Sequence, residues 1–343
     1  TLLASTQAGD RKCRALAMSG GGDKGAYEAA VYLGLVNNLP VDEIAYDIVT
    51  GVSAGSLNTL GLSGYEPRDV EGASEFVYAL WNSIPNYNAF GMWPGGILEG
   101  IFYKAGILDI SPGVEWVTEQ YGDKQVKRKV SFGSVDASSA EYVITEYNAT
   151  FEKSNTIIQS AFASSSLPGI FPPVIRGDQV LIDGGCVWNL DLNSAIRRCK
   201  EIVDDDRDII VDMVLCSNVG VPKDDNIKNY KALNNYMRSR QIFKFYNDMD
   251  DYLSTKEMYP NVNFRYFIAP SQPLSDAVFV SLDFSQKQID KCFEVGQKDA
   301  ANAVKLGSGG YAKVLLEYAS LMKNGTDAEL DKMIEEALRS MEE

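Results

Sequence analysis

The chain alternates short apolar runs with longer segments in which apolar residues recur every three or four positions. Short runs rich in β-branched residues are typical of buried strands, and the three- and four-residue spacing is typical of helices. Their alternation predicts βαβ units and a mainly parallel sheet. The predicted strands cover residues 14–19, 45–50, 130–135, 142–147, 180–182, 209–216 and 263–269.

Helices are predicted between these strands and at the end of the chain. A helix is predicted over residues 26–39 after the glycine cluster, another should follow Gly55, and residues 330–341 carry one apolar stripe. Residues 230–253 repeat aromatic and aliphatic side chains at helical spacing, and we expect this helix to belong to the core rather than to a lid. The pattern predicts a three-layer α/β sandwich over residues 11–305, followed after the glycine-rich break at 306–310 by a helical appendage over 306–343.

The amino-acid composition limits the catalytic mechanisms that the chain can use. Hydrophobic residues make up 45% of the 343 residues and charged residues 23%, as in an ordinary globular chain. The sequence contains no run of 18 apolar residues, so it predicts no membrane-spanning helix. It also contains no histidine. This excludes Ser-His-Asp and Cys-His catalysis, so acid–base chemistry has to use Asp, Glu, Lys, Tyr or Cys.

The charge balance is acidic, with 32 basic and 47 acidic residues and a net charge of −15. Nucleic-acid binding needs a basic surface that displaces counterions from phosphates, and the chain as a whole has none, so no nucleic-acid partner is expected. The same excess gives no general attraction to an anionic membrane. A peripheral membrane contact would therefore depend on a local apolar patch.

Five cysteines are spread along the chain without a Cys-x-x-Cys pair, which argues against a structural metal or a thioredoxin-type site. Two disulfides with one free thiol and five buried thiols are both consistent with this count. The cysteines are Cys13, Cys186, Cys199, Cys216 and Cys292.

Two features predict secretion or an endomembrane lumen, with the cytoplasm as the alternative. Residues 1–10 resemble the remainder of a signal peptide, with small residues at the positions that precede a cleavage site. Asn148-Ala149-Thr150 and Asn324-Gly325-Thr326 are glycosylation sequons, which would make the chain a glycoprotein in such a compartment.

Gly51-Val52-Ser53-Ala54-Gly55 fits the G-x-S-x-G nucleophile elbow. The glycines permit a tight turn from strand to helix, and the turn presents the serine hydroxyl at the helix N-terminus. An apolar strand precedes the motif, as the elbow requires. The alternative is a glycine-rich turn in which Ser53 only caps the helix.

Gly20-Gly21-Gly22-Asp23-Lys24-Gly25 also follows a predicted strand and opens a helix. Consecutive glycines leave backbone N–H groups that a substrate can approach, and the helix dipole favours negative charge there, so the stretch suits an oxyanion. It also satisfies G-x-G-x-x-G, which leaves a dinucleotide site and a plain tight turn as alternatives. It does not fit the P-loop, because the lysine precedes the final glycine.

Asp183-Gly184-Gly185 ends a short predicted strand. Asp-Gly is a common hairpin turn, and that reading stays open. The absence of histidine gives Asp183 more weight, because a carboxylate is the remaining common base for a serine hydroxyl. An ordinary Asp pKa of about 3.9 suits a base poorly, but burial would raise that pKa.

These three motifs, in this order, resemble the patatin-like phospholipase family over residues 13–300, as does the Ser166–Pro173 segment before Asp183. The resemblance implies a patatin-like α/β fold and hydrolysis of phospholipids or other acyl lipids, with no cofactor and no metal. It implies that Ser53 is the nucleophile and Asp183 its partner in a dyad, acting through an acyl-enzyme. The amides of Gly20, Gly21 and Gly22 would form the oxyanion hole. The turns would be shaped by Gly51, Gly55, Lys24, Gly25, Gly184 and Gly185.

Three further points stay open at the level of sequence. The aromatic segment 76–98 does not resemble a regular core element, and it is either an entrance loop that touches lipid or a packed irregular cap. Residues 204–208 are acidic but lack the spaced ligands of a calcium loop, so a solvated turn is expected. A catalytically silent lipid- or protein-binding module and a dinucleotide-binding protein are the alternatives to a hydrolase.

Overall fold

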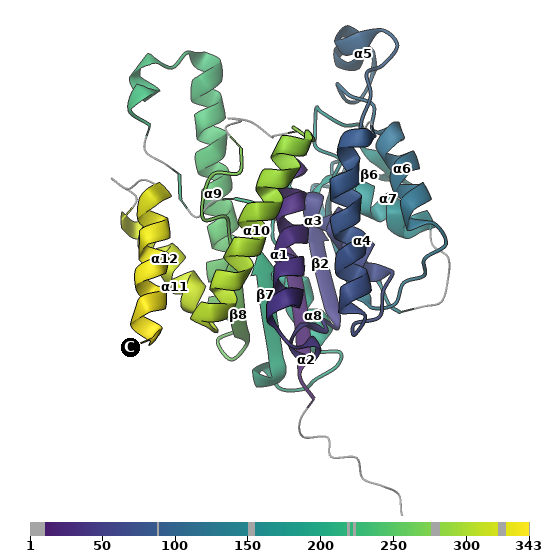
Figure 1. Cartoon of the computed structure of the whole chain (residues 1–343). Helices are drawn as coiled ribbons and strands as arrows, with labels where there is room; N and C mark the ends of the chain where they lie inside the picture. The colour runs from purple at the N-terminus through teal and green to yellow at the C-terminus, as the bar shows by residue number, and fades with distance from the viewer. Residues whose placement is uncertain are drawn as a thin grey trace, which may run out of the picture.

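The computed structural model of the chain describes residues 11–87, 89–149, 155–217, 220–221, 224–275, 282–321 and 327–342. An eight-stranded sheet lies in the middle, with helices packed on both of its faces (Figure 1). The fold is therefore a three-layer α/β sandwich, and the predicted fold class is confirmed. Residues 1–10 and Asn324, which carried the signal-peptide and second-sequon predictions, lie outside the described residues.

The sheet is mainly parallel. β8, β7, β1, β2 and β3 are neighbours in that order and run parallel, whereas β4, β5 and β6 pair antiparallel. All seven predicted strands are present within a few residues, and the three-residue β5 was not predicted. The strands are β1 (Cys13–Met18), β2 (Ile48–Val52), β3 (Lys129–Asp136), β4 (Glu141–Tyr147), β5 (Val174–Arg176), β6 (Gln179–Asp183), β7 (Ile209–Val214) and β8 (Asn263–Ile268).

Helices from distant parts of the chain form the two outer layers. One face of the sheet is covered by α1 (Gly25–Asn38), α3 (Ala54–Ser63), α4 (Val70–Ser83), α7 (Asn155–Ser164) and α10 (Gln286–Leu306), and the other face by α8 (Leu192–Cys199). The remaining helices are α2 (Val41–Ile44), α5 (Gly96–Tyr103), α6 (Ser111–Tyr121), α9 (Ala232–Met258), α11 (Gly310–Leu321) and α12 (Asp327–Glu342).

The mix of apolar and polar residues in each strand matches how deeply the strand is buried. Every residue of β2 is buried, as expected for a central parallel strand that is covered on both faces. β4 pairs antiparallel with β3, and its side chains are partly exposed. Continuous apolar runs therefore mark the middle of the sheet, and mixed runs mark its margin.

The register of β3 brings two strand ends together. Val52, the last residue of β2, pairs with Gly133, and Asp183, the last residue of β6, pairs with the next residue, Ser134. β4 occupies the other edge of β3 along both positions, so β2 and β6 must share one edge. They run in opposite directions and meet end to end. Ser53, the residue after Val52, is thereby placed next to Asp183.

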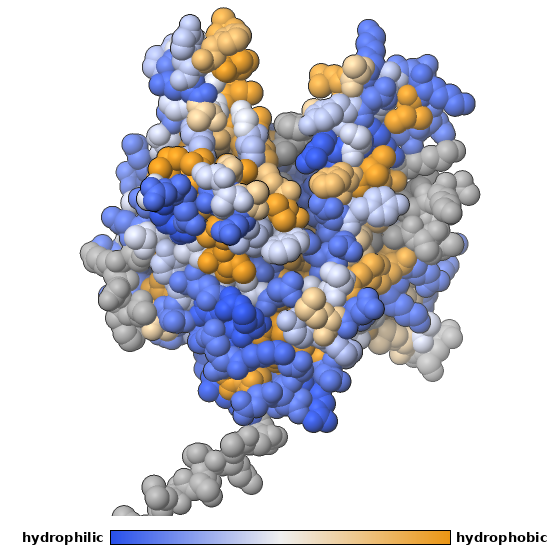
Figure 2. Space-filling view, turned by 180° about the vertical axis from the view of Figure 1, so that it is seen from behind, coloured by the Kyte–Doolittle hydropathy of each residue, from blue (hydrophilic) through white to orange (hydrophobic). Residues whose placement is uncertain are grey.

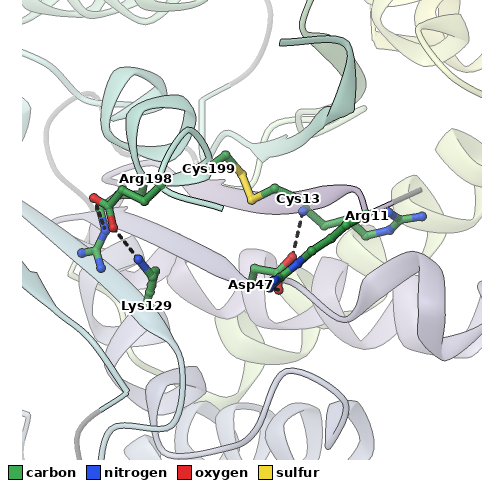
Figure 3. The surroundings of a disulfide bond; sticks show 8 residues. Arg11, Cys13, Asp47, Lys129, Arg198 and Cys199 are labelled. Atoms are coloured by element: carbon green, nitrogen blue, oxygen red, sulfur yellow. Dashed lines mark hydrogen bonds and ion pairs between the residues drawn. A yellow bond between two sulfur atoms is a disulfide. The ribbon is translucent and has the colours of Figure 1, made fainter. Parts of the chain in front are cut away.

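A disulfide joins Cys13 at the start of β1 to Cys199 at the end of α8, 186 positions further along the chain (Figure 3). Next to it, Lys129 pairs with Glu201, and Arg11 lies 4.0 Å from Asp47. The other three cysteines are free thiols, an arrangement between the two that the sequence left open. Closing so long a loop restricts the unfolded chain, which is worth about 2–4 kcal/mol of stability.

Two predictions about aromatic segments are wrong. Residues 76–83 are the second half of the regular helix α4, not part of an irregular loop. The helix predicted over 230–253 exists as α9, but its first half is not core: Leu233 is 66% exposed, Tyr236 60% and Tyr246 66%. Only the second half of α9 packs on the body of the molecule, where Asp248, Met249 and Tyr252 are buried. The first half projects beyond the edge of the sheet (Figure 1).

The C-terminal helices pack against the sheet and its helices. Tyr311 and Leu315 of α11 and Leu330 and Ile334 of α12 belong to the main hydrophobic core. The division of the chain into 11–305 and 306–343 stays a prediction. Within the described residues, no helix has the length and apolar character needed to cross a membrane.

Candidate active site

Ser53 occupies a strained turn between β2 and α3. Its φ of 52° lies in the left-handed region, which is uncommon for a residue with a side chain and marks the turn as an elbow. The Ser53 amide donates to Oγ of Ser164 (3.0 Å) and holds the turn in place. Glycine is required on both sides, because a Cβ at Gly51 would lie 2.2 Å from the carbonyl oxygen of Gly55, and one at Gly55 would lie 2.4 Å from that of Met18.

Asp183 lies beside Ser53 at the end of β6. Its side chain is buried and accepts a hydrogen bond from the amide of Gly185 (2.8 Å to Oδ1). Burial raises the pKa of Asp183 to about 6, although the neighbouring Ser53 hydroxyl and the Gly185 amide favour the carboxylate. Two of the predicted motifs thus place a serine hydroxyl next to a carboxylate whose pKa is close to neutrality.

The glycine loop passes directly over Ser53. A Cβ at Gly20 would lie 2.8 Å from Cβ and 3.5 Å from Oγ of Ser53, so only a residue without a side chain allows this approach. A Cβ at Gly21 would lie 2.2 Å from Cβ of Cys216, on the opposite side of the loop. Gly22, with φ of 66°, opens the short 3₁₀ turn that leads into α1.

The three amides of the loop are not equivalent. The Gly20 amide donates to both the main-chain and side-chain oxygens of Asn189 (3.2 Å each). Within the described residues, the amides of Gly21 and Gly22 donate to no other group of the protein. The oxyanion hole stays a prediction, and within it the amides of Gly21 and Gly22 are the two without a protein acceptor in the described part of the chain.

The turn-supporting residues predicted from sequence pack behind the loop. A Cβ at Gly25 would lie 2.3 Å from the Trp81 ring. Lys24 is largely buried, which lowers the pKa of its amino group, and its carbonyl oxygen lies 3.3 Å from Sγ of Cys216. A Cβ at Gly184 would lie 2.3 Å from the carbonyl oxygen of Gly133, and one at Gly185 would lie 2.6 Å from Oδ1 of Asn189.

Asn189 is a residue of this site that the sequence analysis missed. Its Oδ1 accepts from Gly20 and lies against Gly185, so one amide side chain joins the glycine loop to the loop after Asp183. Its main-chain amide donates to Oδ2 of Asp251 on α9 (2.9 Å). Asn189 follows the Asp-Gly-Gly motif by a few residues, but Asp251 is 62 residues away in sequence, and no spacing rule connects them.

Helix α9 forms a wall of the site. Asp251 also accepts from the amide of Leu190 (3.1 Å), and burial together with the charge of Asp248 raises the pKa of Asp251 to about 7. Lys244 lies two helical turns before Asp251, and its positive charge lowers the pKa of Asp183. Lys244 itself pairs with Asp248 (3.1 Å).

The alternatives from sequence find little support in this geometry. A dinucleotide would need free space around the glycine loop, but Ser53 lies against it on one side and Cys216 on the other. Among the described residues, no group of His, Cys, Asp and Glu is placed to hold a metal ion. The acidic turn at 204–208 is solvent-facing, with its carboxylates paired to Lys12, Lys200 and Arg207.

Comparison with known proteins shows a match to one protein family. The family described as Patatin-like phospholipase matches residues 16–196, which is more than half of the chain and contains all three motifs. No curated protein matches significantly. Among solved structures, VipD from Legionella pneumophila is 13% identical with a TM-score of 0.42, and the match covers 97% of this chain and 75% of VipD. The ExoU–SpcU complex from Pseudomonas aeruginosa is 13% identical with a TM-score of 0.30, and the match covers 87% and 60%.

Proposed function

Because the chain belongs to the patatin-like phospholipase family, we propose that it is a serine lipid acyl hydrolase that cleaves carboxylic esters of phospholipids and other acyl lipids. Family membership supports lipid acyl hydrolysis at the general level. The finer proposal, a Ser53–Asp183 dyad, depends mainly on one observation: the Ser53 hydroxyl lies at a strained elbow next to a buried carboxylate and beside the glycine loop.

In the proposed acylation step, Asp183 takes the proton from Ser53 as Oγ attacks the ester carbonyl. The position of the Asp183 carboxylate next to the Ser53 hydroxyl makes this transfer possible without histidine. The amides of Gly21 and Gly22 stabilise the oxyanion of the tetrahedral intermediate, and such donors are worth about 2.7–4 kcal/mol each. Asp183 then gives its proton to the leaving alcohol, and an acyl ester forms on Ser53.

Water hydrolyses this acyl-enzyme in the second step, with Asp183 again acting as the base. A base works best when its pKa lies near the working pH, and the pKa of about 6 brings Asp183 much closer to that condition than an exposed aspartate. Burial of the carboxylate is therefore the property that makes a two-residue site effective.

A small apolar cavity of about 30 Å³ lies close to the Ser53 end of α3. Leu57 lies one turn beyond Ser53 on α3, and with Leu60 it lines a cavity that continues between α4 and α6. The other lining residues are Gly61, Phe76, Leu80, Trp81, Ile84, Trp116, Val117 and Tyr121. A cavity of this size holds little more than a water molecule, so the choice of an acyl substrate rests on family membership.

Hydrolysis should lose rate below about pH 6. Only the carboxylate form of Asp183 can accept the Ser53 proton, and with its pKa raised to about 6 this form is protonated as the pH falls through that value. We expect kcat/KM for a soluble p-nitrophenyl ester to be level above pH 7 and to fall tenfold per pH unit well below pH 6.

Asp251 is the control for this pH profile. Its pKa is also raised, to about 7, and its carboxylate accepts a hydrogen bond from the amide of Asn189. Asn can accept the same amide hydrogen bonds without titrating, so the Asp251→Asn variant should keep the midpoint near pH 6. A midpoint near pH 4, or one that disappears in Asp251→Asn, would contradict the assignment to Asp183.

The test of the proposed function is phospholipid hydrolysis. Purified protein should release fatty acid from phospholipid in mixed micelles, measured by mass spectrometry. A protein that binds these micelles but releases no fatty acid would instead be a silent lipid-binding module.

We also propose an oxidising compartment, either outside the cell or in an endomembrane lumen. The Cys13–Cys199 disulfide supports this, because such bonds are rare in cytosolic proteins. The described sequon residue Asn148 keeps its side chain at the surface near Arg198, with which it forms a hydrogen bond. Glycosylation at Asn148 and Asn324 stays a prediction.

A further inference from the structure

Two segments project from the end of the molecule where the parallel strands finish, and both carry apolar side chains into solvent (Figures 1 and 2). We call residues 91–105, which include α5, the α5 prong, and residues 226–247, which include the first half of α9, the α9 prong. The exposed apolar residues of the α5 prong are Met92, Ile97, Leu98, Ile101, Phe102 and Tyr103. Those of the α9 prong are Ile227, Leu233, Tyr236, Ile242, Phe243 and Tyr246.

Both prongs are attached at the Ser53–Asp183 site. The α5 prong returns to the body where the amide of Ile107 donates to the carbonyl oxygen of Gly169 (3.1 Å). Gly169 lies three residues after Ser166, whose carbonyl oxygen accepts a hydrogen bond from the amide of Asp183 (2.9 Å). The α9 prong continues into the helix that carries Lys244 and Asp251. A surface that contacts both prong tips would therefore face the site between them.

The charge of the α9 prong is opposite to that of the chain. Residues 226–247 contain five basic and no acidic residues, whereas the whole chain carries −15. Within the described part of the chain, Lys228, Lys231 and Arg240 form no ion pair with a carboxylate. The α5 prong is neutral, because its one acid and one base, Glu99 and Lys104, pair with each other (3.3 Å). Basic and aromatic side chains are thus concentrated at one end of an acidic protein.

We infer that the two prongs form a docking surface for an anionic lipid surface. Apolar side chains on the prong tips would enter the boundary between headgroups and acyl chains, and the basic residues of the α9 prong would contact anionic headgroups. The acidic remainder of the protein is repelled by the same surface, so the charge pattern orients the prongs toward it. The inference rests on the proposed function in one respect, which is that docking would bring acyl lipids to the site.

The charge pattern favours lipid over a second copy of the chain. An identical copy would present the same five basic residues, so two α9 prongs would repel each other. An anionic bilayer offers both parts that the prongs can use, a negative surface and an apolar interior. Attraction to such a surface is about 1 kcal/mol for each basic residue near it, and salt weakens it.

Vesicle co-sedimentation tests the inference without any catalytic step. The full chain with Ser53→Ala, which leaves the lipid intact, is mixed with vesicles of phosphatidylcholine alone or with added phosphatidylglycerol. We expect clear binding only to the anionic vesicles and a decline with increasing NaCl. Changing Lys228, Lys231 and Arg240 together to Gln should weaken binding ~100-fold, and Leu98→Asp with Phe102→Asp should abolish it.

Matched controls are available away from the prongs. Lys305, Lys313 and Lys332 are exposed on α10, α11 and α12, and changing all three to Gln removes the same charge. Met258 at the other end of α9 and Met341 on α12 are exposed, and changing both to Asp adds the same two acids. Both control variants should bind anionic vesicles like the parent, and circular dichroism should show that all variants are folded.

The inference is overturned if the parent binds neither vesicle, if it binds both equally with no effect of salt, or if the lysine controls lose as much binding as the prong variants. It is also overturned if gel filtration shows a dimer that Leu98→Asp with Phe102→Asp dissociates, because the prongs would then form a contact between copies. Hydrolysis of a soluble ester by the wild-type chain is measured separately. Failure there would contradict the proposed function and leave the vesicle result intact.

Discussion

Replacing Ser53 with Ala is expected to lower kcat/KM for ester hydrolysis by ~10⁴-fold or more, because the nucleophile is lost. Asp183→Asn should cost a similar factor, since the amide cannot take the Ser53 proton although it can still accept a hydrogen bond. The double variant should be no slower than either single variant, because the two groups act as a unit. Initial rates with a soluble p-nitrophenyl ester measure all three.

Asp299 provides a matched control for Asp183. It is a buried aspartate whose pKa is likewise raised to about 6 by burial, but it binds the hydroxyl of Tyr27 and the amide of Ser271, away from the dyad. The Asp299→Asn variant should keep kcat within a few-fold of wild type even if the protein is less stable. A large loss of kcat in Asp299→Asn with little loss in Asp183→Asn would contradict the assigned dyad.

Gly21→Ala should produce the second largest loss, about 10²–10³-fold in kcat. The φ of Gly21 is −167°, outside the left-handed region that favours glycine, so we attribute the effect to the new methyl group. That methyl group would lie 2.2 Å from Cβ of Cys216 and would push the loop and its open amides away from Ser53. Steady-state kinetics with the soluble ester measure the loss.

A rescue and a control make the Gly21 result specific. Cys216→Gly removes the atoms in the way, so the double variant Gly21→Ala with Cys216→Gly should recover a substantial part of kcat. Gly91→Ala places a methyl group 3.6 Å from its nearest neighbour, Pro112, and should be close to wild type. Full activity in Gly21→Ala alone would mean that the loop does not position the oxyanion donors.

The sequence predicted the sheet well because its central strands are buried on both faces and are therefore mainly apolar. β1, β2 and β7 carry such runs, interrupted by Arg14 in β1 and Asp212 in β7, and all were predicted within a few residues. The three-residue β5 was missed, because it is too short and too exposed to have a pattern. The meeting of β2 and β6 on β3 could not be predicted, since it depends on register, although it places Asp183 beside Ser53.

The residues that the sequence missed act through tertiary contacts. The Asn189–Asp251 hydrogen bond crosses 62 positions and joins elements with no shared motif. The exposure of α9 was missed for a related reason: helical spacing shows that a helix has an apolar face but does not identify what covers it. The basic segment 226–247 was also missed, because the net charge of −15 is a sum over the chain and does not show where the charges lie.

The most direct test of the central claim, that Ser53 is an activated nucleophile, is covalent labelling with a fluorophosphonate. The account predicts that one probe adds per chain, that peptide mass spectrometry finds it on Ser53, and that Ser53→Ala takes up none while Asp183→Asn labels much more slowly. Phospholipid hydrolysis by a chain that takes up no probe, or labelling at another residue that persists in Ser53→Ala, would contradict it.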